Sequence, residues 1–227
     1  MRKGHQDFVT VVSDVEKGVL IEVIDSHKQD KIIEVLMEQP LELRQGVKEV
    51  SVDMWGGFPK VAEKVFPNAV LVIDRFHVMK AVNQDLNRLR KKLGITDRGS
   101  KFLLLRNGGD LAPDQIVKLA AVLDKSASLR IAYELKEEFR QIYETNHTVK
   151  SGRYQFDKWL RLADLFFNEA ASTIRNHLDG ICNYFISRTT SGVMEGINNR
   201  IKLIKRQAYG FSNFDNFRFR LLACFSH

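Results

Sequence analysis

The sequence predicts an α/β fold that carries a large all-helical insertion, and three features lead to this prediction. The first third alternates strand and helix patterns, residues 74–188 show only helical periodicity, and the last part, 189–227, holds one strongly patterned helix. The chain has 227 residues and is 44% hydrophobic, which is enough for one large domain or for a core with an insertion. We therefore expect three parts, 1–73, 74–188 and 189–227.

Strands and helices are expected to alternate in the first part. Apolar runs and turn residues predict strands at 8–12 and 18–24, joined through 14–18 as a hairpin. Further along, the patterns predict a helix at 32–37, a strand at 47–52, a helix at 56–66 and a strand at 69–73. The order is strand, strand, helix, strand, helix, strand.

The middle part shows helical periodicity interrupted by turn signals such as Asn107-Gly108-Gly109-Asp110. Three apolar seams are expected to form its core. Their members are Met79, Val82, Leu86, Leu89 and Leu93; Ile131, Leu135, Phe139 and Ile142; and Ile174, Leu178, Ile181 and Phe185. We predict that these helices pack onto the α/β part.

Composition excludes several classes of protein. No apolar run is long enough to span a membrane and the first residues, MRKGHQDF, lack a signal-peptide core, so we expect a cytoplasmic protein. Only two cysteines occur, Cys182 and Cys224, which argues against a disulfide framework and against a structural zinc site.

Positive charge is concentrated in two stretches of a chain whose net charge is +7. From Leu71 to Lys101 there are eight Lys or Arg against three Asp, and from Gly196 to Arg220 six against one. Clustered cations commonly neutralise phosphates, so a polyanionic partner is one interpretation and solvated helix faces are the other.

Two aspartates follow predicted strands. Asp53 comes directly after 47–52 and precedes a glycine pair, and Asp74 comes directly after 69–73. Open α/β sheets commonly build sites at the carboxyl ends of their strands, although a loop carboxylate or a helix cap would occupy the same position. His77 lies three residues after Asp74, so on a helix their side chains would share a face and could bond each other or one ligand.

A third acid, Glu195, begins a helix with two contrasting sides. Glu195, Asn199, Lys202 and Arg206 recur at helical spacing, while Ile197, Ile201 and Ile204 lie opposite. An acid at the head of a basic stripe suits a metal ligand beside a phosphodiester, with a solvated polar face as the competing interpretation.

Two long stretches resemble the transposases of bacterial insertion sequences of the ISL-three type. They are VSVDMWGGFPKVAEKVFPNAVLVIDRFHVMKAVN and SGVMEGINNRIKLIKRQAYGFSNFDNFRFRLL, and the resemblance extends from about Lys3 to the C-terminus. It implies a ribonuclease-H-like core with an Asp, Asp, Glu triad, two divalent metals, and a helical insertion between the second Asp and the Glu.

The resemblance implies a role for each candidate residue. Asp53 would be the second acid and Glu195 the last, both metal ligands, and Asp74 and His77 would form an Asp-x-x-His signature beside the scissile phosphate. Magnesium is the expected ion, with manganese as the alternative, because carboxylate oxygens suit hard cations. The expected DNA contacts are Arg75, Asn199, Lys202, Lys205 and Arg206.

The sequence departs from the family pattern at its beginning. The first Asp of the triad, and the central strand that bears it, would lie upstream of Met1, as would the zinc-binding and helix-turn-helix regions. Asp7, Asp14 and Asp25 offer no argument for taking its place. The chain thus resembles the C-terminal portion of a transposase, and the neighbours of the missing strand would be left with unpaired backbone groups.

Two kinds of function follow from these expectations. The first is a metal-dependent enzyme that cleaves DNA and transfers strands of an insertion sequence, with DNA ends and target as partners and a homo-oligomer as the working form at full length; as this chain alone it is expected to be inactive. The second is a non-catalytic DNA-binding remnant. A hydrolytic nuclease on a ribonuclease-H-like fold is a further alternative.

Overall fold

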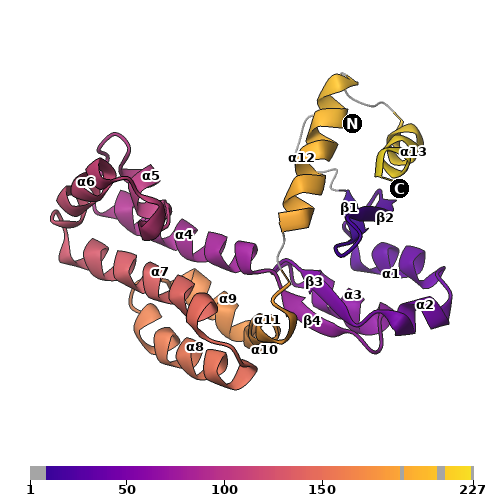
Figure 1. Ribbon diagram of the computed structural model, residues 1–227, viewed down its shortest axis with the longest axis horizontal. Coiled ribbons are helices and arrows are strands. Elements are labelled where there is room, and N and C mark those ends of the chain that lie inside the picture. The colour runs from indigo at the N-terminus through magenta and orange to yellow at the C-terminus, as the bar shows by residue number, and fades with distance from the viewer. Residues whose placement is uncertain (1–8, 190–191, 209–212, 226–227) are drawn as a thin grey trace. The chain divides into compact units, whose positions relative to one another are not determined.

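The computed structural model describes residues 9–189, 192–208 and 213–225 (Figure 1). The chain divides into two compact units, one made of residues 1–71 and 189–227 and the other of residues 72–188. The fold is mixed α/β and mostly helical. No described helix is long and apolar enough to cross a bilayer.

The first unit begins with the expected hairpin. Strands β1 (Thr10–Asp14) and β2 (Val19–Ile24) pair antiparallel, with a register shift between Val12 and Ser13. Val11 pairs with Val23 and Ser13 with Leu20, so the shift brings Leu20 and Val23, three residues apart, to the same face of the hairpin. Simple alternation could not have placed both there.

Two helices from the end of the chain complete the core on this face. Helices α12 (Gly192–Gln207) and α13 (Phe214–Phe225) pack their apolar sides on the hairpin. The buried members of this cluster are Leu20, Val23, Ile197, Ile204, Phe217, Leu221 and Phe225. The apolar side that the spacing predicted for α12 is therefore confirmed.

A second cluster joins the hairpin to helices α1 (Gln29–Met37) and α3 (Gly57–Val65). Its buried members are Ile24, Ile32, Ile33, Leu36, Val61 and Val65. Along the chain, α1 and α3 are separated by α2 (Leu41–Gly46) and β3 (Glu49–Val52). Sequence analysis missed α2, which buries none of its residues and so shows no apolar periodicity.

The described strands form two separate pairs and no larger sheet. Strand β4 (Val70–Ile73) pairs with β3, and this pair is separate from the β1–β2 hairpin. The predicted order of strands and helices is otherwise confirmed, with α2 as the addition.

The second unit is helical beyond the end of β4. Its helices are α4 (Arg75–Lys92), α5 (Ser100–Leu105), α6 (Pro113–Leu123), α7 (Ala127–Thr145), α8 (Val149–Ala163), α9 (Asn168–Asn176), α10 (Leu178–Cys182) and α11 (Tyr184–Ser187), with a 3-10 turn η1 (Gly108–Asp110). Figure 1 shows α4, α7 and α8 as its long rods.

Aromatic side chains fill the core of this unit. Trp159 and Phe139 have ring centroids 4.5 Å apart, and Phe156 and Phe167 are also fully buried. The predicted seams are mostly confirmed, but Leu93 and Ile131 are exposed. Leu93 follows the last residue of α4, and Ile131 lies on α7 beside a buried face that runs through other positions.

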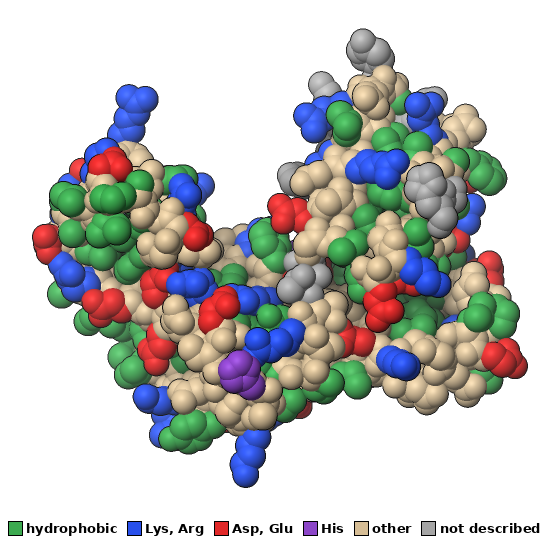
Figure 2. Space-filling model, in the orientation of Figure 1, with side chains coloured by type: hydrophobic (Ala, Val, Ile, Leu, Met, Phe, Trp, Pro, Cys, Tyr) green, Lys and Arg blue, Asp and Glu red, His purple; other side chains and the backbone are tan. Residues whose placement is uncertain are grey.

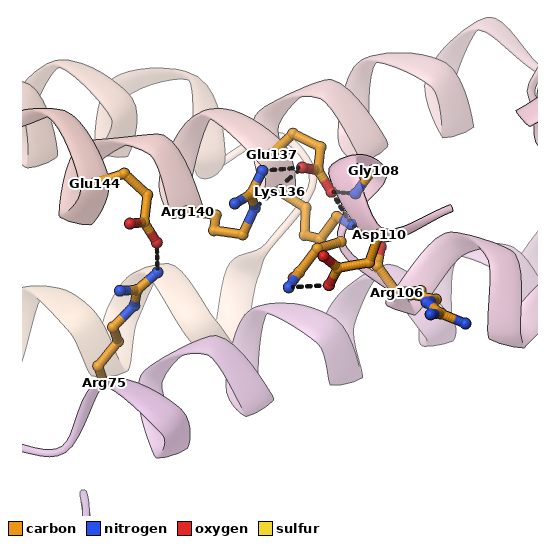
Figure 3. Close-up of polar contacts among 9 residues, drawn as sticks. Arg75, Arg106, Gly108, Asp110, Lys136, Glu137, Arg140 and Glu144 are labelled. Atoms are coloured by element: carbon orange, nitrogen blue, oxygen red, sulfur yellow. Dashed lines mark hydrogen bonds and ion pairs between the residues drawn. The ribbon is translucent and has the colours of Figure 1, made fainter. Parts of the chain in front are cut away.

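A polar network inside this unit fastens the turn before α6 to α7 (Figure 3). Lys136, only 1% exposed, pairs with Glu137 and donates to the Arg106 carbonyl at 2.9 Å. Glu137 also accepts from Arg140 at 3.1 Å and from the Gly108 amide at 3.2 Å. Burial raises the pKa of the Glu137 carboxyl, but its bonds to Lys136 and Arg140 outweigh burial and lower it.

Candidate active site

Asp53 lies where β3 ends, as the sequence predicted. Its Oδ1 accepts a hydrogen bond from the Trp55 amide at 2.8 Å, which turns the chain toward α3. The carboxylate is half-buried, and among the described residues its Oδ2 has no hydrogen-bond or ion-pair partner. One oxygen therefore fixes the side chain while the other is available to a ligand.

The turn after Asp53 depends on a glycine. A Cβ on Gly57 would lie 2.1 Å from the Trp55 ring, so only glycine lets the indole lie across the start of α3. Trp55 also meets the Phe58 ring edge-on, with centroids 4.8 Å apart. These contacts give the loop that carries Asp53 a defined shape.

Asp74 and His77 are in contact, as their three-residue spacing predicted. Asp74 caps α4, because its Oδ1 accepts from the Phe76 amide at 2.9 Å, and its Oδ2 lies 2.8 Å from His77 Nδ1. Asp74 is 8% exposed, whereas the His77 side chain is 38% exposed. A buried carboxylate thus orients an accessible imidazole.

Helix α10 packs closely against the end of β4, just before Asp74. Gly180 of α10 approaches Ile73, the last residue of β4, so closely that a Cβ on it would lie 2.8 Å from the isoleucine side chain. Ile73 is fully buried. The residue before Asp74 is therefore held by packing within the helical unit.

Arg75 makes several contacts inside the helical unit, and Figure 3 shows the one with Glu144. It pairs with Glu144 of α7, bonds Tyr184 of α11, and lies over the Tyr143 ring with its guanidinium carbon 4.9 Å from the centroid. Burial lowers the pKa of Arg75, but the bonds to Glu144 and Tyr184 outweigh it and raise the pKa. Arg75 therefore joins the start of α4 to α7 and α11, and its expected DNA contact stays a prediction.

Sequence analysis missed the partners of Arg75. Tyr143 is buried, burial raises its pKa, and within the described part of the chain its hydroxyl has no hydrogen-bond partner. The seam through Ile142 gave no reason to single out the two residues after it. The signal in the sequence was weak, since pairing a cation with an acid 69 positions later needs the fold.

Glu195 lies in the first turn of α12 and is exposed, with no hydrogen-bond or ion-pair partner among the residues that the structure describes. Beside it, Met194 packs toward the hairpin and accepts a hydrogen bond from Ser13 Oγ at 2.6 Å. Glu195 therefore directly follows a residue of α12 that is anchored to the hairpin.

The polar side of α12 carries the predicted cations. Asn199, Lys202 and Arg206 are exposed and Lys205 is half-buried, and Arg206 Nε donates to the Lys202 carbonyl at 3.3 Å. Figure 2 shows Lys and Arg side chains over this helix. None of the three cations pairs with a carboxylate in the described part of the chain, so their charges are available to an anionic partner.

The candidate residues fall into two groups. Asp53 and Glu195 belong to the first unit, and Asp74, Arg75 and His77 to the second. Within the described residues no group of three or more His, Cys, Asp or Glu side chains is arranged to hold a metal ion. The two carboxylates nevertheless have the hard oxygen donors that Mg²⁺ prefers, and this ion commonly binds one or two protein carboxylates and completes its shell with water and phosphate.

Comparison with known proteins gives a consistent result. A family model described as Transposase, of the DDE type named ISL3, matches residues 1–221. The chain is 27% identical to the transposase for insertion sequence element IS1001 of Bordetella parapertussis, over 99% of this chain and 59% of that protein. It is 24% identical to the transposase for IS1557 of Mycobacterium tuberculosis, over 92% of this chain and 54% of that protein.

The chain spans little more than half the length of these relatives. A protein of Lactococcus lactis named ATP-dependent protease is 31% identical over a shorter stretch, 44% of this chain. No solved structure matches. Since the family model covers nearly the whole chain, the protein belongs to the ISL3 family of DDE transposases.

Proposed function

We propose that the chain is part of the catalytic domain of a DNA transposase that cleaves and joins strands at the ends of an insertion sequence. The observation that carries this proposal is the state of two acids in one unit. Among the described residues, one oxygen of Asp53 is fixed and the other has no partner, and Glu195 is exposed and unpaired at the head of a basic helix.

The arrangement of strands supports a ribonuclease-H-like core. In such a core, as the resemblance implies, a central strand with the first acid lies between the hairpin and the later strands. The described strands form two separate pairs, β1–β2 and β3–β4, which is the division expected when that strand is not among them. We therefore propose that catalysis requires a further carboxylate, on a strand that is not among those described.

Each candidate residue has a proposed task. Asp53 and Glu195 would hold magnesium, which when bound neutralises charge on a phosphodiester and activates a nucleophile. Asp74 holds the His77 ring so that its outer edge can donate to a phosphate oxygen. Lys202, Lys205 and Arg206 would neutralise neighbouring phosphates and keep the strand in place.

The test is strand cleavage by a protein extended at its N-terminus with the strand that bears the first acid. We expect magnesium-dependent cleavage and joining of DNA that carries the insertion-sequence ends, lost in Asp53→Asn and in Glu195→Gln. Glu63→Gln, which changes an exposed acid of α3, should cleave normally. A folded extended protein without activity would refute the proposal, and cleavage without joined products would indicate a hydrolytic nuclease.

One observation favours a second candidate, a DNA-binding protein without catalysis. The exposed cations Lys202 and Arg206 of α12 form no ion pair within the described part of the chain. This alternative predicts salt-dependent DNA binding that is indifferent to Asp53→Asn and Glu195→Gln. Magnesium-dependent nicking that either substitution abolishes would exclude it.

A further inference from the structure

We propose that the helical unit carries a DNA-binding surface of its own, at the end of α4, the following turn and α5. This surface, called here the α4–α5 surface, takes no part in the roles assigned above. Its cations are Lys91, Lys92, Arg98, Lys101 and Arg106. Its aromatic member is Phe102, which is 50% exposed.

The turn that presents this surface is firmly built. Gly94 and Gly99 have φ values of 69° and 85°, a conformation that favours glycine, and they reverse the chain between α4 and α5. Arg90 is buried and holds the turn from inside, donating to the Ile95 carbonyl at 2.5 Å and to Asn87 Oδ1 at 3.0 Å. One arginine of this stretch is therefore structural, and its neighbours point to solvent.

The cations of the α4–α5 surface form no ion pair with any described residue. All five are exposed. The acid closest in sequence, Asp97, is already paired with Lys125. The surface therefore keeps a concentrated positive charge that fits the phosphates of a nucleic acid.

Helix stabilisation does not explain the whole set. Lys91 and Lys92 lie in the last turn of α4, where cations interact favourably with the helix dipole. Lys101, however, lies in the first turn of α5, where the dipole disfavours a cation, and Arg98 lies outside both helices. A ligand with negative charge accounts for all of them.

Phe102 indicates what kind of nucleic acid fits. Its ring is exposed beside an open hollow lined by Lys101, Phe102, Leu105 and Arg106, and the Arg106 guanidinium lies 5.3 Å from its centroid. A ring among cations can stack on a base only if that base is unpaired, so we commit to single-stranded or locally opened DNA.

The inference rests on the proposed function only in taking DNA as the partner, and it can fail separately. Binding of the purified chain to a labelled single strand, and to the duplex of the same sequence, is measured in EDTA at several salt concentrations. The test variant combines Lys92→Gln, Arg98→Gln and Lys101→Gln. The matched control removes three exposed cations of α8 that form no ion pair with any described residue, by Lys150→Gln, Lys158→Gln and Arg161→Gln.

The test variant should flatten the dependence of log Kd on log salt by about three, roughly one for each phosphate that is no longer neutralised, and the control should leave it unchanged. Phe102→Ala should weaken single-strand binding about 5- to 100-fold, with a much smaller effect on the duplex. Its control is Tyr154→Ala, which removes an exposed ring of α8.

Equal salt dependence in the test and control variants would overturn the inference, as would a wild-type chain that does not bind DNA. If only changes at Lys202, Lys205 and Arg206 weaken binding, the proposed function stands and the α4–α5 surface is rejected. If Phe102→Ala separates a dimer and leaves DNA affinity unchanged, the inference is also overturned, because the surface then binds a second copy of the chain instead.

Discussion

Asp53 and Asp74 occupy equivalent local positions and have different surroundings. Each follows a strand, β3 or β4, and each accepts the amide of the residue two positions later, at 2.8 Å and 2.9 Å. The second oxygen of Asp74 is bound to His77 in a buried corner. The second oxygen of Asp53 has no partner among the described residues.

The comparison separates two uses of a carboxylate. A carboxylate whose two oxygens both accept hydrogen bonds stabilises the fold and positions a neighbour. Its removal should mainly lower the free energy of unfolding. An acid with a free oxygen contributes little to stability and remains available to a cation. Stability measured in each unit therefore distinguishes the two acids, and each unit contains one tryptophan, Trp55 in the first and Trp159 in the second.

The largest effect is expected where a carboxylate is most engaged. Glu137→Ala should destabilise the helical unit by about 3–5 kcal/mol, because it leaves the buried Lys136 ammonium without its counter-ion. Urea unfolding followed by Trp159 fluorescence measures this change. Glu138→Ala, which removes the exposed acid next to it, should change stability by no more than about 0.5 kcal/mol. Equal effects would contradict the account.

The second largest loss of stability is expected for Asp74→Ala. It removes the cap of α4 and the partner of His77 from a buried position, so the helical unit should lose about 2–3 kcal/mol. Asp53→Ala removes one hydrogen bond from a half-buried position and should cost at most about 1 kcal/mol in the first unit. If the two substitutions cost the same, the distinction between the acids fails.

The loss of stability on acidification should be smaller than the losses caused by Glu137→Ala and Asp74→Ala. The pKa of Glu137 is lower in the folded protein than its usual 4.5. A lowered folded-state pKa gives stability that is fully present above the unfolded value and is lost as pH falls through the folded one. The helical unit should therefore lose stability below about pH 4.5. Glu137→Gln should reduce this acid-dependent loss, and an unchanged pH profile would contradict it.

The smallest effect on stability belongs to Glu195. Glu195→Gln should leave the first unit within about 0.5 kcal/mol of the original stability, because the exposed carboxylate has no partner in the described structure. Unfolding followed by Trp55 fluorescence measures it. A loss of more than about 1 kcal/mol in the free energy of unfolding would show that Glu195 stabilises the fold.

Local patterns predicted much of the fold. The hairpin, the helix predicted at 32–37 and observed at 29–37, and the contact of Asp74 with His77 follow from alternation or from helical spacing. The register shift at Val12 and Ser13 and the helix α2 could not be predicted, since one depends on strand pairing and the other has no buried side.

Long-range contacts set the limit for the site. Arg75 was singled out for its charge, but its partners Glu144 and Tyr184 lie on α7 and α11, and only the packed helices bring them together. Asp53 was predicted from its place after a strand, whereas only the structure shows that its second oxygen has no partner among the described residues. Sequence patterns find candidate residues, and the packing decides which of their atoms remain available.

The most direct test of the central claim is metal binding at Asp53 and Glu195, read from the broadening of backbone NMR signals by added Mn²⁺. Signals of residues 53–55 and 193–196 should broaden first, and Asp53→Asn and Glu195→Gln together should remove the effect. Signals near Asp74 and Glu137 should show no specific broadening. Specific broadening at Asp74, or none at Asp53 and Glu195, would contradict the account.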